Sequence, residues 1–290
     1  MNEKPLISIG VSTYNRKDYL KLSLDSLLSQ TYPNCEIIVV DDGSSDNTGE
    51  MVKELYPQVK YVYQTNAGDA AAKNHAAALA QGEYIIFNDS DDLFLPDAVE
   101  RLYDALKDKE KNSCSYGTYI TIDPDGKELP TKRKIAAYPS GNITGDLIGH
   151  ILVNSTATLI PRELFLQNDG FGNIRQVAAD YAFYLKLSTQ CNFYAVQEPV
   201  FLRRRHGGNI SSINYDKQLT VLNVLEKFLA ANPDVQSRYA GKIKKRLAVL
   251  NSKLCREARK ENRVAEAKMH ARKAFKLQPT LKNFFRMLGF

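Results

Sequence analysis

The chain has 290 residues, 43% of them hydrophobic and 25% charged, which suits one large globular domain or one domain with an appendage. No stretch approaches the ~20 apolar residues of a membrane span, and the N-terminus carries no apolar signal region, so we expect a cytoplasmic protein. The four cysteines lie far apart without a Cys-x-x-Cys pair, which argues against structural zinc.

Strands and helices alternate over the first part of the chain. Short apolar and β-branched runs predict strands at about 6–12, 36–41, 60–64 and 83–88. Helical patterns fall at about 17–30, 46–55, 69–80 and 96–108. This alternation predicts βαβ units and therefore a mainly parallel sheet with flanking helices.

The alternation ends after residue 110. A strand is expected at 113–122, and 131–150 is polar and irregular. Regular patterns resume with an apolar segment, a helix and a strand, at about 151–160, 179–189 and 193–203. From about 216 onward the pattern is helical. We therefore expect an α/β domain over residues 1–215 and a helical C-terminal extension over 216–290.

Three carboxylates follow the fourth expected strand within four positions: Asp89, Asp91 and Asp92. Like charges about 4 Å apart repel by roughly 4 kcal/mol per pair near a protein surface, so such a cluster favours a bound cation. Carboxylate oxygens suit Mg²⁺ or Mn²⁺, whose coordination substrate phosphates often complete. The alternative is that these are solvated loop acids or caps for a helix beginning near Pro96.

A second acidic pair, Asp41 and Asp42, ends the strand at 36–41 and precedes a Gly-Ser turn. If the strands are parallel, both acidic groups fall at the same edge of the sheet. Ligands of open α/β sheets bind outside the carboxyl ends of the strands. The sequence therefore predicts a ligand site at this edge.

Charge is distributed unevenly along the chain. Residues 238–290 hold 16 Lys or Arg and 3 Glu, a net charge of +13; subtraction from totals of 39 and 33 leaves 23 basic and 30 acidic residues before them, a net of −7. The basic helices are either a solvated face or a face for an anionic membrane or an acidic partner. No nucleic-acid-binding motif accompanies them, so no nucleic-acid partner is expected.

Four motifs resemble, in order and spacing, those of the family 2 glycosyltransferases. They are Val11-Ser-Thr-Tyr-Asn15, Ile37-Ile-Val-Val-Asp-Asp-Gly-Ser-Ser-Asp46, Asn66-x-Gly68 with Lys73-Asn74, and Asp89-Ser-Asp-Asp92 followed by Pro96-Asp97. The agreement is specific over residues 5 to about 105 and thinner to about 215. The resemblance implies a GT-A fold, with about 1–110 binding a nucleotide sugar and 111–215 forming the acceptor side.

The resemblance also implies roles for individual residues. In that family these motifs hold the base, ribose and diphosphate of the donor. The positions that would contact the nucleotide sugar here are Thr13, Tyr14, Asn15, Asp41, Asp42, Asn66, Lys73, Asp89 and Ser90. Asp91 would bind Mn²⁺ or Mg²⁺, which neutralises the diphosphate leaving group. For Lys73 the alternative is an ordinary surface lysine.

The resemblance places a catalytic base in the second half. The family has an aspartate, usually preceded by glutamate, at the start of a helix beneath the acceptor, and Asp180 occupies that position. A carboxylate is an adequate base for a sugar hydroxyl. The alternative is that Asp180 only caps its helix. Ala179 stands where the family usually has glutamate, which puts the identity of the acceptor in doubt.

The run Arg203-Arg-Arg-His206 precedes two glycines. In GT-A enzymes a histidine after the last core strand can complete the metal shell, so the resemblance implies His206 as a metal ligand. One or more of the arginines, Arg205 among them, would pair with the diphosphate.

Taken over all of these motifs, the resemblance implies a metal-dependent, inverting glycosyltransferase. It would move a sugar from a nucleotide donor, with UDP expected, to a hydroxyl of a glycan or lipid-linked glycan, and its basic helices would allow peripheral contact with the inner face of a membrane. Two alternatives remain open. One is a non-catalytic nucleotide-sugar-binding partner of a polysaccharide assembly complex. The other is a sugar nucleotidyltransferase, which needs a Gly-rich loop where this chain has Ser-Thr-Tyr-Asn-Arg.

Overall fold

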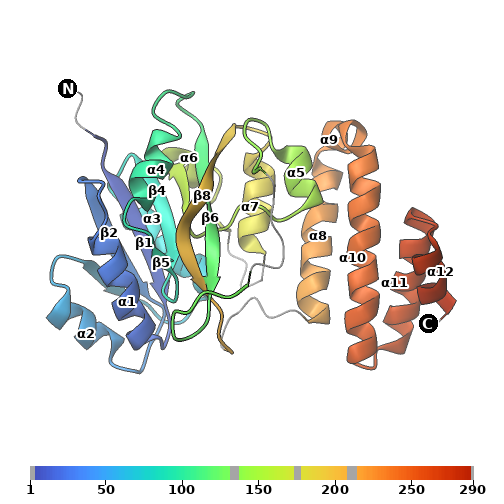
Figure 1. The fold of residues 1–290 in the computed structure, drawn as a ribbon, viewed down its shortest axis with the longest axis horizontal. Helices are drawn as coiled ribbons and strands as arrows, with labels where there is room; N and C mark the ends of the chain where they lie inside the picture. Colours follow the sequence, from blue (N-terminus) through green and yellow to red (C-terminus); the bar gives the residue numbers. More distant parts are fainter. Residues whose placement is uncertain (1–3, 131–136, 173–177, 208–213, 289–290) are drawn as a thin grey trace. The chain divides into compact units, whose positions relative to one another are not determined.

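The computed structural model describes residues 4–130, 137–172, 178–207 and 214–288 (Figure 1). Contacts divide the chain into two compact units. Unit 1 comprises Met1–Ile143, Val153–Arg175 and Leu187–Asn209, and unit 2 comprises Thr144–Leu152, Gln176–Lys186 and Ile210–Phe290. The domain boundary expected at 215 stays a prediction.

Unit 1 is built on a sheet with the strand order β3-β2-β1-β4-β7-β6-β8-β5. The strands are β1 (Ile7–Thr13), β2 (Cys35–Asp41), β3 (Lys60–Tyr63), β4 (Tyr84–Asp89), β5 (Leu93–Phe94), β6 (Cys114–Ile122), β7 (Thr158–Pro161) and β8 (Phe193–Arg204). The first four pair in parallel, which confirms the expected βαβ arrangement. Beyond them the sheet is mixed, since β7 is antiparallel to both β4 and β6.

The helices of unit 1 connect and cover the parallel strands. They are α1 (Lys17–Leu28), α2 (Thr48–Leu55), α3 (Asp69–Leu79), α4 (Ala98–Asp104) and α6 (Arg162–Gln167). Helix α3 packs closely on β1 because Gly10 has no side chain there: a Cβ at Gly10 would lie 2.9 Å from the Cβ of Ala76. This close packing places the first turn of α3 beside the carboxyl end of β1.

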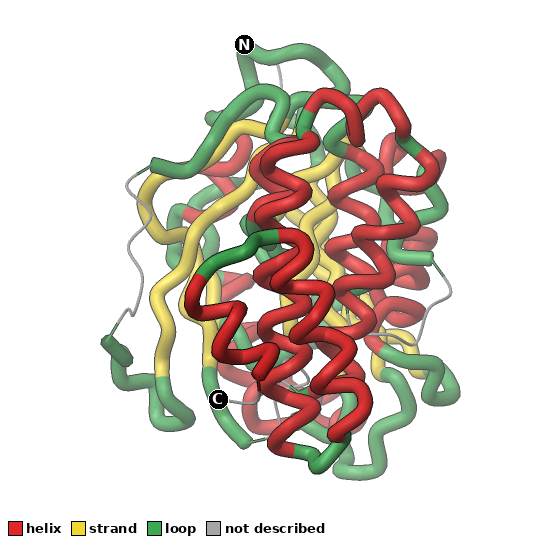
Figure 2. Tube along the Cα trace, turned by 90° about the vertical axis from the view of Figure 1, so that its right-hand side faces the viewer, coloured by secondary structure: helices red, strands yellow, loops and turns green. Residues whose placement is uncertain are grey.

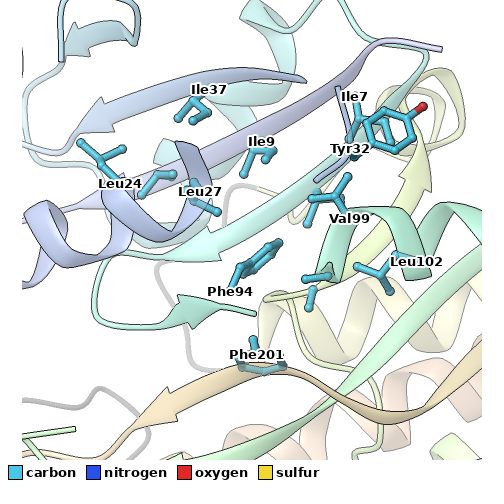
Figure 3. Close-up of a cluster of buried hydrophobic side chains, with 14 of the residues drawn as sticks. Ile7, Ile9, Leu24, Leu27, Tyr32, Ile37, Phe94, Val99, Leu102 and Phe201 are labelled. Atoms are coloured by element: carbon cyan, nitrogen blue, oxygen red, sulfur yellow. The ribbon is translucent and has the colours of Figure 1, made fainter. Parts of the chain in front are cut away.

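The face of β1 and β2 that meets α1 and α4 carries the main hydrophobic core (Figure 3). The close-up shows side chains from both strands, α1, α4, β5 and β8: Ile7, Ile9, Ile37, Leu24, Leu27, Phe94, Val99, Leu102 and Phe201. Full burial of one such side chain contributes about 1.5–3 kcal/mol. Because helices cover both faces of the parallel strands, their sequences are almost continuously apolar until the chain reaches the polar residues at the strand ends.

Unit 2 is helical in its described residues. Its helices are α5 (Thr144–Gly149), α7 (Ala179–Leu187, whose last residue is assigned to unit 1), α8 (Tyr215–Ala231), α9 (Pro233–Arg238), α10 (Ala240–Lys260), α11 (Val264–Leu277) and α12 (Leu281–Leu288). Figure 2 shows α10 and α11 side by side. Buried alanines, among them Ala258, Ala267 and Ala271, allow this close packing, as expected for a helical hairpin.

Length and apolar character together decide whether a helix can cross a bilayer. No helix within the described ranges has both to the necessary degree.

Candidate functional site

The carboxyl end of β1 carries Thr13, whose buried hydroxyl has no hydrogen-bond partner among the described residues. Such an atom costs about 1–3 kcal/mol if nothing satisfies it, so it marks a position where a ligand would be stabilising. Tyr14 follows with half of its surface exposed (50%). Asn15 has a φ of 50°. Its side-chain Oδ1 accepts a hydrogen bond from the Ser45 backbone amide at 2.8 Å, and its backbone amide donates to Ser44 Oγ at 2.8 Å. Asn15 thereby fixes the loop after β2.

The two acids after β2 are buried and hold the neighbouring backbone. Asp41 accepts hydrogen bonds from the Tyr61 hydroxyl and the Ser44 amide, both at 2.8 Å. Asp42 accepts from the backbone amides of residues 67 and 68, at 2.7 and 2.8 Å. Their carboxylates therefore brace the loops that border the strand ends, and a nucleoside would have to share these oxygens with the protein.

Lys73 on α3 is a buried cation that links two partly exposed carboxylates. Its Nζ lies 2.9 Å from Asp69 Oδ2, 2.5 Å from Asp89 Oδ1 and 3.1 Å from Ser155 Oγ. Burial disfavours the charged form of Lys73, but the two carboxylates outweigh burial and raise its pKa. Burial would likewise raise the pKa of Asp89, but Lys73 outweighs it and holds that pKa below its usual value. Lys73 is therefore not an ordinary surface lysine.

Asp91 and His206 come together although they follow different strands. The buried Asp91 places Oδ2 2.7 Å from His206 Nε2 and 3.0 Å from Arg16 Nη1. The imidazole stacks on the ring of Tyr19 at a centroid distance of 5.0 Å, which holds it against the carboxylate. A carboxylate oxygen and an imidazole nitrogen are suitable donors for Mn²⁺, and Mg²⁺ prefers the oxygen.

The described part of the chain contains no group of three or more His, Cys, Asp or Glu residues that could hold a metal. Asp91 and His206 thus offer two donors. A divalent ion that fits this pair would take its remaining ligands from water and from a substrate diphosphate. The donor set therefore fits an ion that binds together with its nucleotide.

Asp92 and Arg204 hold the turn after β4 in place. Asp92 is buried and accepts the Arg204 amide at 2.9 Å; burial raises its pKa well above the usual value, and Asp89 and Asp91 add to the increase. The Arg204 guanidinium donates to the Asp91 carbonyl at 3.1 Å and to the carbonyls of residues 123 and 124 at 3.2 and 2.7 Å. Asp91 and Asp92 are therefore neither solvated loop acids nor helix caps.

The other two arginines of the run differ in exposure. Arg203 lies over the ring of Tyr119 at 5.3 Å and donates to its hydroxyl at 3.3 Å. Arg205 has an exposed side chain, and its backbone amide donates to the Ile122 carbonyl at 2.8 Å. Arg205 is therefore the member of the run with a side chain exposed to solvent.

Asp180 belongs to unit 2, in the first turn of α7. Its Oδ1 accepts the Tyr181 amide at 2.7 Å, and the half-buried side chain follows a buried Ala179. Ala178, just before the helix, has a φ of 77°. This left-handed conformation costs an alanine about 1–2 kcal/mol, and such strain is often found at functional sites.

The sheet edge of unit 1 gathers most of the residues expected at the site: Thr13, Tyr14, Asn15, Asp41, Asp42, exposed Asn66, Lys73, Asp89, buried Ser90, Asp91, Arg205 and His206. Their roles stay predictions, as does that of Asp180 in unit 2. Four further residues at this edge were not expected: Arg16, Tyr19, Asp69 and Ser155. Two of them had a signal in the sequence, since Arg16 follows the Thr-Tyr-Asn turn directly and Asp69 precedes Lys73 by one helical turn.

Comparison with curated proteins gives named relatives. Over 218 residues the chain is 35% identical to a chondroitin synthase of Pasteurella multocida strain Pm70, an alignment that covers 74% of this chain and 22% of the relative. It is also 35% identical over 215 residues to a hyaluronan synthase of Pasteurella multocida, covering 73% and 22%. The chain thus spans about a fifth of these two relatives. An uncharacterised glycosyltransferase of Rickettsia typhi is 30% identical over 237 residues, covering 78% of this chain and 70% of the relative.

Two solved structures share the fold. Staphylococcus aureus TarS 1–349, in complex with UDP-GlcNAc, has a TM-score of 0.62 at 16% identity, covering 97% of this chain and 89% of that one. The mannosyltransferase PcManGT from Pyrobaculum calidifontis, in complex with GDP-Man and Mn²⁺, has a TM-score of 0.59 at 18% identity, covering 99% and 79%. Residues 8–166, more than half of the chain, match the model of glycosyl transferase family 2. The chain therefore belongs to glycosyl transferase family 2 and has the GT-A fold.

Proposed function

We propose that the protein transfers a sugar from a UDP-linked donor to a hydroxyl of a glycan or lipid-linked glycan, with inversion and with Mn²⁺ or Mg²⁺ at the diphosphate. The observation that carries the proposal is the contact between Asp91 and His206, 2.7 Å apart at the sheet edge. The relatives named as chondroitin and hyaluronan synthases support a glycan acceptor, and the TarS complex with UDP-GlcNAc supports a UDP-linked donor.

In this proposal Asp91 and His206 would hold the divalent ion. When bound, the ion would neutralise the negative charge that develops on the nucleoside diphosphate leaving group. Lys73 keeps Asp89 ionised and fixes its Oδ1, so that Oδ2 is left for a ribose hydroxyl. The unsatisfied hydroxyl of Thr13 and the exposed ring of Tyr14 line the base.

Asp180 acts as the general base on the acceptor hydroxyl. Its position in the first turn of α7 favours a negative charge, because the backbone amides there carry partial positive charge. The acceptor oxygen attacks the anomeric carbon from the face opposite the leaving group, the glycosidic bond to the diphosphate breaks, and Asp180 receives the hydroxyl proton. A displacement of this kind inverts the anomeric configuration.

The enzyme works in the cytoplasm, in peripheral contact with an anionic membrane through the basic helices of unit 2. Lys244 and Lys245 are exposed on α10. On α12, Leu281 and Phe285 expose 77% and 52% of their surface. Basic and apolar groups of this kind suit the surface of an anionic leaflet, where lipid-linked acceptors are inserted.

A thermal-unfolding screen tests the donor and the metal without an acceptor. UDP, GDP and their sugar conjugates are each added with Mn²⁺, with Mg²⁺ or with EDTA. A ligand at 100 times its dissociation constant adds about 2.7 kcal/mol to the free energy of unfolding, so UDP with a divalent ion should raise the midpoint by several degrees. A larger increase with GDP would overturn the UDP assignment, and equal increases in EDTA would overturn the metal.

A further inference from the structure

Arg246 on α10 is a cation buried inside unit 2. Only 8% of its surface is exposed, and its Nε is buried without a hydrogen-bond partner. No carboxylate of the described residues pairs with it. Arginine is almost never fully buried unless it is paired, because the charge loses its hydration. The unmet charge of Arg246 is therefore a feature that a ligand could satisfy.

The neighbour of Arg246 is a neutral hydroxyl. Tyr181 donates from its hydroxyl to the Leu147 carbonyl at 3.0 Å, which leaves the oxygen lone pairs to accept a hydrogen bond from the guanidinium. Burial raises the pKa of Tyr181 to about 12, although Arg246 lowers it. The phenol therefore stays protonated at neutral pH and cannot balance the charge of Arg246.

Other cations of unit 2 do have acidic partners. Lys242, one helical turn before Arg246, lies 3.2 Å from Asp146. Farther along α10, Arg256 and Lys260 both pair with Glu257, at 2.9 and 2.8 Å. These three exposed cations are thus paired within the protein, while Arg246 has no carboxylate partner among the described residues. This is the reverse of what stability alone favours, because a buried charge gains most from a partner.

The place of Arg246 in unit 2 indicates what would pair with it. Tyr181, which it contacts, directly follows Asp180 on α7. If Asp180 is the base, the acceptor sugar is bound at the start of this helix. The planar guanidinium matches two oxygens of a carboxylate or a phosphate, which a lysine cannot do with the same geometry.

We propose that Arg246 is a specificity residue that binds an oxyanion of the acceptor, so that the enzyme takes an acidic glycan. This inference rests on the proposed transferase function. A uronic acid carboxylate and a sugar phosphate share the chemistry that Arg246 recognises. A neutral acceptor would leave the guanidinium unpaired and would be used poorly.

The test compares three acceptors with wild type and with Arg246→Met, which keeps an apolar stem and removes the charge. The acceptors are an oligosaccharide ending in glucuronic acid, the same oligosaccharide with that carboxyl group reduced to the alcohol, and one ending in a sugar phosphate. We expect wild type to prefer one acidic acceptor over the neutral one by at least about tenfold in kcat/KM. Arg246→Met should lose that preference, because its kcat/KM should fall much further with the acidic acceptor than with the neutral one. The acidic acceptor that wild type prefers shows whether Arg246 binds a carboxylate or a phosphate.

Two controls separate this inference from the proposed function. Lys242→Met removes an exposed cation from the same helix and should keep the acidic preference. Arg246→Lys keeps the charge without the planar guanidinium and replaces Arg246→Met in the test if that variant does not fold. Arg246→Lys should fold and retain part of the acidic preference. No acidic preference in wild type, or equal losses with acidic and neutral acceptors, would overturn the role of Arg246. Absence of UDP-sugar hydrolysis and of transfer in wild type would instead overturn the proposed function.

Discussion

His206 Nε2 lies 2.7 Å from Asp91 Oδ2, across 115 positions of the sequence. The same carboxylate oxygen meets Arg16 at 3.0 Å, so the protein alone already supplies this acid with positive charge. A divalent ion that bound here would therefore have to displace part of this arrangement, and two protein donors are few for an ion that has to give up water. We expect the ion to bind weakly on its own and tightly with a nucleoside diphosphate.

Asp91→Asn should weaken UDP binding in Mn²⁺ sharply, because the ion loses a charged ligand. Loss of an outer-shell partner already costs roughly 10- to 100-fold in metal affinity, and we expect at least that. Calorimetric titration with UDP in Mn²⁺ and in EDTA measures the effect. Asp97→Asn, a nearby exposed acid paired with Arg101 at 3.7 Å, is the matched control and should bind UDP normally. UDP affinity unchanged by EDTA in wild type would show that the metal assignment is wrong.

Thr13→Val should weaken UDP binding by roughly 2- to 10-fold without lowering stability. The hydroxyl has no partner within the described structure, so the free protein loses no hydrogen bond when valine replaces threonine. Thr158→Val is the control, since that buried hydroxyl donates to the Asn154 carbonyl at 2.6 Å. It should lower the free energy of unfolding by about 1 kcal/mol and leave UDP affinity unchanged. If Thr13→Val instead destabilises the protein and binds UDP normally, the hydroxyl has a structural role.

The first four strands could be predicted because each βαβ unit is local: an apolar run, a turn and a periodic helix lie within about 30 residues. The elements that were not predicted are short. β5 has two residues and is a strand only because it pairs with β8, where Leu93 lies opposite Leu202. Helices α5 and α6 have six residues each, too few for the apolar period to show.

The sequence predicts only those residues of the site that belong to recognisable motifs. The acids at the strand ends followed from strand pattern and resemblance, but the burial of Lys73 did not, because it depends on Asp69, Asp89 and Ser155 meeting in space. The sequence alone does not distinguish the three consecutive arginines, of which Arg203 and Arg204 end β8 and Arg205 follows it. Alternation along an extended chain separates them, so that Arg204 is buried and Arg205 is exposed.

Asp180→Asn should keep donor affinity and lower turnover by about 10² or more, the usual scale for a positioned general base. Steady-state rates and UDP titration measure the two effects separately, and thermal unfolding reports on the fold. Asp146→Asn, an acid of α5 in the same unit that pairs with Lys242, serves as the control and should keep full turnover. A loss of activity that is matched by a loss of stability of about 1 kcal/mol would support the capping role instead.

His270 should make unit 2 less stable in mild acid. It is buried, with Nδ1 2.8 Å from Asn251 Oδ1 and Nε2 3.0 Å from the Tyr215 hydroxyl. Burial, with Lys273 adding to it, lowers the pKa of His270. The unfolded state, with a pKa of about 6.5, then binds more protons than the folded state, so stability is full above that value and falls as pH drops below it.

Urea unfolding at about pH 7.5 and about pH 5.5 measures this loss for wild type and His270→Gln. The variant should lose less stability between the two pH values than wild type, because glutamine takes up no proton. His75→Gln, whose imidazole contacts Gln64 in unit 1, is the control and should keep the wild-type difference. An equal pH difference in wild type and His270→Gln would show that other groups cause the acid sensitivity.

The basic helices of unit 2 should bind vesicles that contain anionic lipid. Each Lys or Arg near such a surface contributes about 1 kcal/mol, so Lys244→Glu with Lys245→Glu should weaken binding by more than about tenfold. Leu281→Ser with Phe285→Ser should weaken it too, by removing exposed apolar surface on α12. Lys21→Glu with Lys53→Glu makes the same charge change at exposed positions of unit 1 and should have little effect. Binding measured by sedimentation should fall at ~0.5 M salt, because attraction between exposed charges is then screened within a few ångströms. Binding that depends on neither anionic lipid nor salt would mean that these charges are solvated and that the membrane plays no part.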